Sequence, residues 1–445
     1  RIMPDSLTTT SLETLRSLND PSSLTTEELA GSTWPYLRII WATLPIAYVW
    51  LLPVLAMIGY AYKCEDVTIC NSHGESVSIY VSNAQSTGAM MAVFGWPLMH
   101  LLRVKHHAHK RGFFLLIIFL ASFGALLCVP VIHWHMLHTM VAAIFCISAV
   151  LLHYVLLKNC AESPMRWCKF LTVVAIVAFA SAFLEIIVSC ITGSHIPWLS
   201  WVLVSSGLTA VSLFPWFYEK ESLSQPRAPR LSAVDLAKPH AMILMFVGAV
   251  LPVIYVWSLP ALANMGFAHK CDGLPRCIYD QSGGGGQASV SNFIANPQAT
   301  GMMAATFVWP IYHMWSMKHH AGRWGFVLII FFWTFFGAFL AAPCTEFPKT
   351  HNVVVGIFCV CGLIFQGLLH GHCRRDRLVI CSICLAIGAL SLMGVIVTGA
   401  IALTGEFMSK NLPWMFYCLE SAGLTAVAIF PWLYRFEKRH TVSEH

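Results

Sequence analysis

The sequence predicts an all-α, polytopic membrane protein whose twelve transmembrane helices form two parallel six-helix repeats. Composition is the first observation behind this prediction. Of the 445 residues, 57% are hydrophobic and 11% are Asp, Glu, Lys or Arg, which is less than half of the charged share of about 25% usual in soluble domains. A mean hydropathy of +0.67 excludes disordered, collagen-like and coiled-coil chains, and also a large soluble enzyme.

Apolar runs are the second observation. A helix needs about 20 residues to cross the hydrocarbon core of a bilayer, and runs of about this length occur twelve times. The expected spans lie near 39–61, 87–104, 112–131, 136–157, 169–191, 197–217, 240–263, 299–316, 324–343, 351–371, 378–402 and 412–433.

An internal copy is the third observation. The segment 82–107 (SNAQSTGAMMAVFGWPLMH…KHH) repeats as 295–320 (ANPQATGMMAATFVWPIYH…KHH) at a constant offset of 213 residues. Near the ends of the two halves the offset becomes 216, where 197–218 matches 413–434. Such self-similarity indicates a tandem duplication. Because each half has an even number of spans, the two repeats should share one orientation.

These boundaries give the expected domain organisation. It comprises a cytosolic tail at 1–37, a first repeat at 38–218, a cytosolic linker at 219–238, a second repeat at 239–434 and a cytosolic tail at 435–445.

The positive charges predict the orientation. If the spans alternate, 22 of the 27 Lys and Arg residues lie on the side of the amino terminus. Cytosolic loops collect Lys and Arg, so both termini should face the cytosol. The net charge of +6 then reflects topology, and no nucleic-acid partner is expected.

Two cysteine pairs agree with this orientation. Cys64 and Cys70 follow the first span, and Cys271 and Cys277 follow the seventh, each pair with five residues between its members. Both loops are expected outside the cytosol, where an oxidising environment would close each pair into a disulfide. A zinc site is the weaker alternative because no further Cys or His recurs beside both pairs, and no metal site is expected.

A polar set recurs in both halves. It consists of Gln85, Thr87, Gly88 and His138 in the first half, and of Gln298, Thr300, Gly301 and His351 in the second. The topology places these residues at the outer ends of the second and fourth spans of each half. An amide, a hydroxyl and an imidazole together suit a phosphate or glycan headgroup. The alternative is a structural network that joins the two span ends with the same atoms.

Only two carboxylates fall inside the expected spans, Glu185 and Glu420. An acid in hydrocarbon normally faces a cavity or a partner. These two therefore serve either as hydrogen-bonded contacts between helices or as part of a lipid-headgroup or ion site. Val204 occupies the position equivalent to Glu420, which disfavours a symmetric ion path built on paired acids.

The order of features in each half resembles the six-span family of the post-GPI-attachment lipid-remodelling factor and the damage-regulated autophagy modulators (DRAM). The resemblance rests on single residues spread over most of both halves rather than on one dense motif. They are Leu44-Pro45 and, less clearly, Leu251-Pro252 in the first span; a Cys-containing outer loop; a second span ending in His100 or His313; a fourth span opening with His138 or His351; and Glu420 near Tyr417 in the last span, where Val204 departs from the pattern.

The resemblance implies lipid handling in the endoplasmic reticulum, the Golgi or the plasma membrane. The expected role is that of an accessory or scaffold subunit in lipid remodelling of the GPI type, in lipid transfer or in membrane trafficking. The expected partners are membrane lipids, including a bound phospholipid or sterol, and other membrane or lipid-transfer proteins. No cofactor and no catalytic residue is implied. The alternatives are a secondary transporter of a small solute and a membrane-embedded lipid-modifying enzyme that uses Glu420, His138 or His351.

Overall fold

All regular structure in the described part of the chain is helical. The computed structural model describes residues 35–63, 75–104, 109–159, 165–193, 196, 198–222, 239–269, 289–372, 378–403 and 414–443, and no strand occurs among them. The all-α class is therefore confirmed. Within these residues, nine helices are long and apolar enough to cross a membrane, which is the architecture of a polytopic membrane protein.

A long helix lies at each of the twelve predicted positions. These helices are α3 (Pro35–Met57), α6 (Ala84–Val104), α7 (His109–Cys128), α8 (His135–Asn159), α9 (Arg166–Thr192), α10 (Leu199–Ser222), α12 (Pro239–Asn264), α14 (Pro297–Ser316), α15 (Gly322–Ala341), α16 (Pro348–His372), α17 (Val379–Leu403) and α18 (Met415–Ser443). The described residues also form three short helices that were not predicted: α5 (Val77–Tyr80), α13 (Val290–Phe293) and the 3₁₀ helix η2 (Lys318–Ala321).

Three of the long helices are not among the nine apolar ones, namely α6, α7 and α14. The apolar part of α7 is limited to Gly112–Cys128, because the helix opens with His109, Lys110 and Arg111. Helices α6 and α14 carry amide, hydroxyl and imidazole side chains and an internal proline. Nearly all of α14 is buried against protein, so it does not need the apolar surface of a lipid-facing helix.

Two helices run past the expected repeat ends. Helix α10 continues beyond residue 218 to Ser222, and α18 continues beyond residue 434 to Ser443. These last turns carry charged residues, such as Glu219 and Lys220 in α10 and Arg435 and Glu437 in α18, so no apolar run marks them in the sequence.

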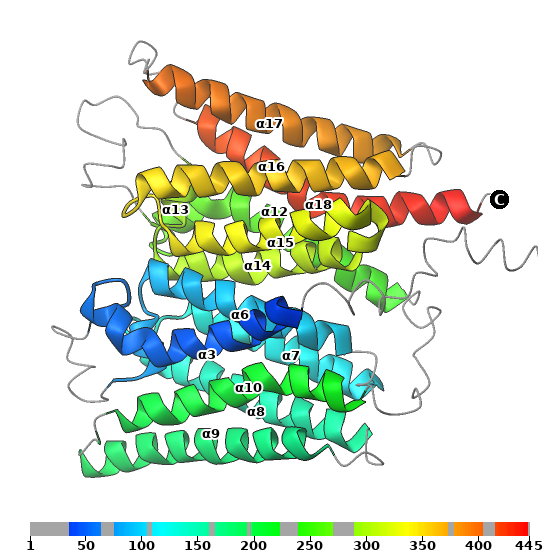
Figure 1. The fold of residues 1–445 in the computed structure, drawn as a ribbon. Coiled ribbons are helices and arrows are strands. Elements are labelled where there is room, and N and C mark those ends of the chain that lie inside the picture. Colours follow the sequence, from blue (N-terminus) through cyan, green and yellow to red (C-terminus); the bar gives the residue numbers. More distant parts are fainter. Residues whose placement is uncertain are drawn as a thin grey trace, which may run out of the picture.

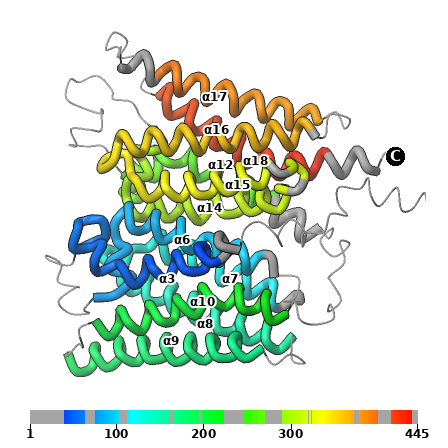
Figure 2. The backbone as a smooth tube through the Cα atoms, in the orientation of Figure 1, coloured from blue at the N-terminus to red at the C-terminus, as the bar shows by residue number. Residues whose placement is uncertain are grey.

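The two halves meet through their second and third helices. Helix α6 packs chiefly against α15, and α14 packs chiefly against α7. Figure 1 shows α3 to α10 below and α14 to α18 above, with α6 and α14 facing each other at the junction. The backbone trace places α9 and α17 at opposite outer edges (Figure 2). The core therefore continues from one half into the other.

Glycines allow this close packing. A Cβ on Gly88 would lie 2.1 Å from the carbonyl oxygen of Leu340, and a Cβ on Gly301 would lie 2.3 Å from that of Leu127. These contacts are equivalent at the offset of 213, and both cross between the halves. Small residues let two helix backbones approach closely in this way.

A glutamate at the same position in each half accepts hydrogen bonds from the first turn of a neighbouring helix. Glu221 accepts hydrogen bonds from the backbone amides of Trp167 (3.0 Å) and Cys168 (3.4 Å) in the first turn of α9. Glu437 does the same for Ile380 (2.7 Å) and Cys381 (3.0 Å) in the first turn of α17. Both acids satisfy amides that have no partner inside their own helix.

Candidate functional site

A cavity of about 120 Å³ lies inside the first half. Its walls come from α8 on one side and from α9 and α10 on the other, while α5, α6 and the end of α7 close its base. The helices form two pairs, because α7 packs tightly on α8 and α9 packs tightly on α10, whereas α8 and α9 touch less. The cavity occupies the space between these two pairs.

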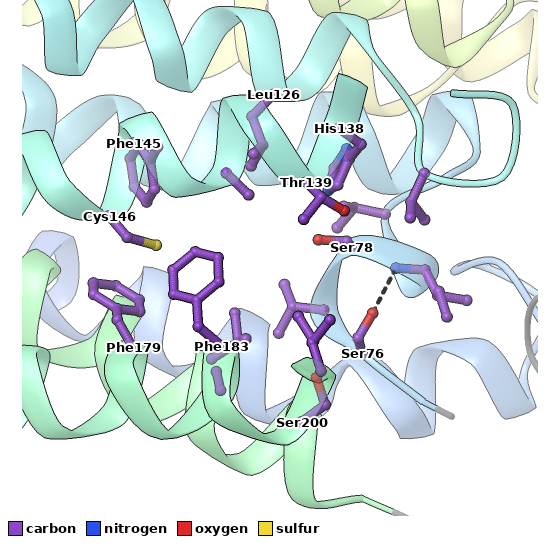
Figure 3. Close-up of a pocket in the computed structure, with 18 of the residues that line it drawn as sticks. Ser76, Ser78, Leu126, His138, Thr139, Phe145, Cys146, Phe179, Phe183 and Ser200 are labelled. Atoms are coloured by element: carbon purple, nitrogen blue, oxygen red, sulfur yellow. Dashed lines mark hydrogen bonds between the residues drawn. The ribbon is translucent and has the colours of Figure 1, made fainter. Parts of the chain in front are cut away.

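The cavity has one polar end and one apolar end (Figure 3). His138 and Thr139 at the start of α8 lie with Ser78 of α5 at the polar end. Phe145 and Phe179 lie at the other end, in a group completed by Cys146 and Phe183. A ligand that fills this space must carry polar atoms at one end and carbon at the other.

Half-buried residues of α8 and α9 line part of the cavity, among them Ala142, Phe183 and Ile186. Ser78 of α5 and Leu126 of α7 are half-buried lining residues as well, whereas Val77, Met90 and Leu127 are buried. The outer surfaces of α8 and α9 carry large exposed apolar side chains, including Ile144 at 48% and Ile187 at 54% exposure. The two helices that line most of the cavity therefore also present an apolar surface to the outside.

His138 lines this cavity, and its two ring nitrogens differ in their partners. Its Nδ1 lies 2.5 Å from the carbonyl oxygen of Val129, so Nδ1 carries the proton and donates it. The side chain is 4% exposed, and its Nε2 is buried with no hydrogen-bond partner among the described residues. In the neutral ring Nε2 is an acceptor, and burying it without a partner is unfavourable. A ligand with a donor would satisfy it.

His351 repeats part of this arrangement. Its Nδ1 lies 2.6 Å from the carbonyl oxygen of Ala342, and its Nε2 is also buried without a hydrogen-bond partner in the described part of the chain. Its ring packs against Phe339, with the ring centroids 5.1 Å apart. The first half has the smaller Leu126 at the position of Phe339, and Leu126 lines the cavity.

The other members of the predicted polar set are placed differently. The hydroxyl of Thr87 donates to the carbonyl oxygen of Val81 (2.7 Å), and that of Thr300 donates to Ile294 (2.6 Å). These bonds fix the turns that lead into α6 and α14. Gln85 is half-buried, Gln298 is 7% exposed, and neither they nor Thr87 and Thr300 line this cavity. The structure therefore brings His138 to the cavity and leaves the rest of the set at the helix starts.

The two intramembrane carboxylates have different surroundings. Glu185 is half-buried in α9 and lines the cavity. Glu420 contacts α13 instead, because its Oε2 accepts from the backbone amide of Val290 at 2.6 Å and its Oε1 lies 3.5 Å from the hydroxyl of Ser291. Glu420 thereby ties α18 to the segment that leads into α14.

Short helix α5 is held firmly at the base of the cavity. The hydroxyl of Ser76 caps it by accepting from the amide of Ile79 at 3.3 Å. At its other end the hydroxyl of Ser86 donates to the carbonyl of Tyr80 (2.8 Å), and the phenol of Tyr80 donates to Glu75 (2.6 Å). Burial, and then the bond to Glu75, raise the pKa of the Tyr80 phenol, so it stays a donor.

The predicted cysteine pairs, Cys64 with Cys70 and Cys271 with Cys277, lie outside the described residues. Among the described residues no group of three His, Cys, Asp or Glu side chains is placed to hold a metal ion. The chain matches no family model, no curated protein and no solved structure.

Proposed function

We propose that this multi-pass membrane protein binds a lipid in the cavity between α8 and α9 and handles it as an accessory or scaffold subunit in lipid remodelling or transfer. The main support for this proposal is that the cavity is polar at one end, where His138, Thr139 and Ser78 lie, and apolar at the other, where phenyl rings lie. The half-buried lining residues and the exposed apolar side chains of α8 and α9 support this proposal, because a lipid tail that passes between two membrane helices does not leave the hydrocarbon. The resemblance to lipid-remodelling proteins points to the same class of ligand.

The proposal includes a topology. All twelve long helices cross the membrane as two parallel repeats, and both termini lie in the cytosol. The membrane is an endomembrane or the plasma membrane. The excess of Lys and Arg on one side supports this orientation. The polar end of the cavity then lies at the depth of the headgroups in the non-cytosolic leaflet, where a lipid places its own polar atoms.

The cavity volume limits what is held inside. A cavity of about 150 Å³ accepts a molecule the size of benzene, so the present one of about 120 Å³ encloses the polar head and the first carbons of a chain. The remainder of the chain would lie along the seam between α8 and α9. Its tail gains little hydrophobic energy there, since lipid is already apolar. Selectivity would therefore come from the polar end.

Filling the cavity tests the proposal. Ala182 is 5% exposed and lines the cavity from α9, so the phenyl ring of Ala182→Phe would occupy the space of the ligand. We expect lipid that co-purifies with the protein, counted by native mass spectrometry, to fall about tenfold.

The control variant is Ile187→Phe, which enlarges an outward-facing side chain on the same helix. It should retain the lipid of the unmodified protein. Equal lipid content in both variants, with Ala182→Phe folded, would contradict the proposal.

A further inference from the structure

The two halves differ at the base of the cavity. Residues Ser76-Val77-Ser78 of the first half correspond to Ser289-Val290-Ser291 of the second. Each segment opens a four-residue helix that its first serine caps through the amide three residues on. These two segments therefore have the same backbone arrangement in both halves, which we call the backbone frame. The halves differ in the side chains that pack against it.

In the second half a carboxylate faces this frame. Glu420 contacts the amide of Val290 (2.6 Å) and the hydroxyl of Ser291 (3.5 Å). In the first half the equivalent residue is Val204, which lines the cavity together with Val77 and Ser78. The place of the carboxylate is thus part of the cavity.

Neighbouring positions show the same asymmetry. Ala142 and Ser200 line the cavity, whereas the second half has Val355 and Phe416 at those positions. The second half therefore has larger side chains at both positions. What the second half places there, a carboxyl group with carbon behind it, indicates the chemistry that fits the first.

We propose that the cavity binds the carboxyl group of a long-chain fatty acid in the place that the Glu420 carboxylate takes in the second half. The carboxyl oxygen accepts from the amide of Val77 and the hydroxyl of Ser78. The carboxyl O–H donates to Nε2 of His138, a bond that the side chain of Glu420 does not make to His351 in the second half, where Nε2 has no partner among the described residues. This inference rests on the proposed function and specifies its ligand. His138 is the independent sign of a ligand, because it lines the cavity and its Nε2 is buried with no partner in the described residues.

The acceptor nitrogen of His138 selects the form of the ligand. Because Nδ1 donates to Val129, Nε2 needs a donor, which a carboxylate anion lacks. The neutral acid supplies both an acceptor and a donor. No covalent bond is made or broken, and the acid keeps its proton while donating it in a hydrogen bond to the imidazole of His138. The alkyl chain then runs toward Phe145 and Phe179.

Ligand comparison gives the first test. The full chain, purified in detergent, is titrated with isotope-labelled palmitic acid and with methyl palmitate. We expect one palmitic acid per chain and about tenfold weaker binding of the ester, because the ester has no proton for His138. Equal affinity for the two probes would overturn the assignment of the carboxyl group.

A substitution that copies the second half gives the second test. Val204→Glu should place a carboxylate against Val77 and Ser78 and weaken palmitic acid binding about tenfold or more. Val204→Leu is the matched control, since it adds volume without a carboxyl group, and should bind palmitic acid more tightly than Val204→Glu. Unchanged binding in Val204→Glu would overturn the proposal.

Photocrosslinking keeps the test independent of the folding of that variant. Palmitic acid with a diazirine in its chain should label peptides of α8 and α9 in the unmodified protein, and an excess of palmitic acid should suppress the labelling. Labelling confined to other helices would overturn the proposal. If a diazirine phospholipid labels α8 and α9 and the fatty acid does not, lipid binding stands and the fatty-acid assignment fails. If neither probe labels them, both fail.

Discussion

Replacing Gly301 by alanine is expected to destabilise the protein by about 2–3 kcal/mol or more, and Gly88→Ala should do the same. A methyl group on either glycine would overlap the backbone of a helix from the other half, with separations of 2.3 Å and 2.1 Å from carbonyl oxygens. Backbone cannot move aside as a flexible side chain does, so α14 would have to shift away from α7, or α6 from α15. The thermal unfolding of the purified protein in detergent, followed by tryptophan fluorescence, measures the loss.

Gly356→Ala is the control for both variants. Gly356 lies inside α16 with open space around its Cα, so alanine there should stabilise the helix by up to about 1 kcal/mol. If Gly301→Ala unfolded at the temperature of Gly356→Ala, the close approach between the halves would be wrong.

Loss of either predicted disulfide is expected to lower stability by about 2 kcal/mol. In the loop-closure account, a bond between Cys64 and Cys70 removes the freedom of a short segment in the unfolded chain, and the bond between Cys271 and Cys277 does likewise. Cys64→Ser and Cys271→Ser should therefore unfold at lower temperature and show reduced folding yield. The variant Cys190→Ser, which removes an exposed free thiol, provides the comparison.

Intact-mass analysis after alkylation without reductant checks the bonds directly. The predicted result is that Cys64, Cys70, Cys271 and Cys277 stay unmodified until a reductant is added. Reaction of all four thiols would contradict both the disulfides and the outer location of these loops.

The positions of the helices could be predicted from the sequence because a helix that crosses a membrane needs a long apolar run. The internal repeat helped as well, because a run in one half could be compared with the matching segment of the other half. Which helices meet could not be predicted in this way. Hydropathy does not show which helices pack together. The packing of α6 on α15 and of α14 on α7, each across the two halves, was therefore not predicted. A signal was present, since Gly88 and Gly301 lie in helices that are not among the nine apolar ones, and small residues there indicate close packing.

The candidate site was predicted only in part. His138 and Glu185 do line the cavity, but Thr87 and Thr300 use their hydroxyls on nearby carbonyls. A hydroxyl near a turn readily bonds local backbone, and equivalence between repeats does not reveal this. The more informative signal was where the repeats differ. Val204, which stands where the second half has Glu420, lies in the lining of the cavity.

Electron cryomicroscopy of the full chain in lipid nanodiscs tests the central claim most directly. We expect an elongated density between α8 and α9, with its head within hydrogen-bond distance of Nε2 of His138 and its tail beside Phe145 and Phe179. The equivalent region of the second half should show only the side chains of Glu420 and its neighbours. A well-ordered map with an empty or water-filled cavity, and with lipid density only on the outer surface, would contradict it.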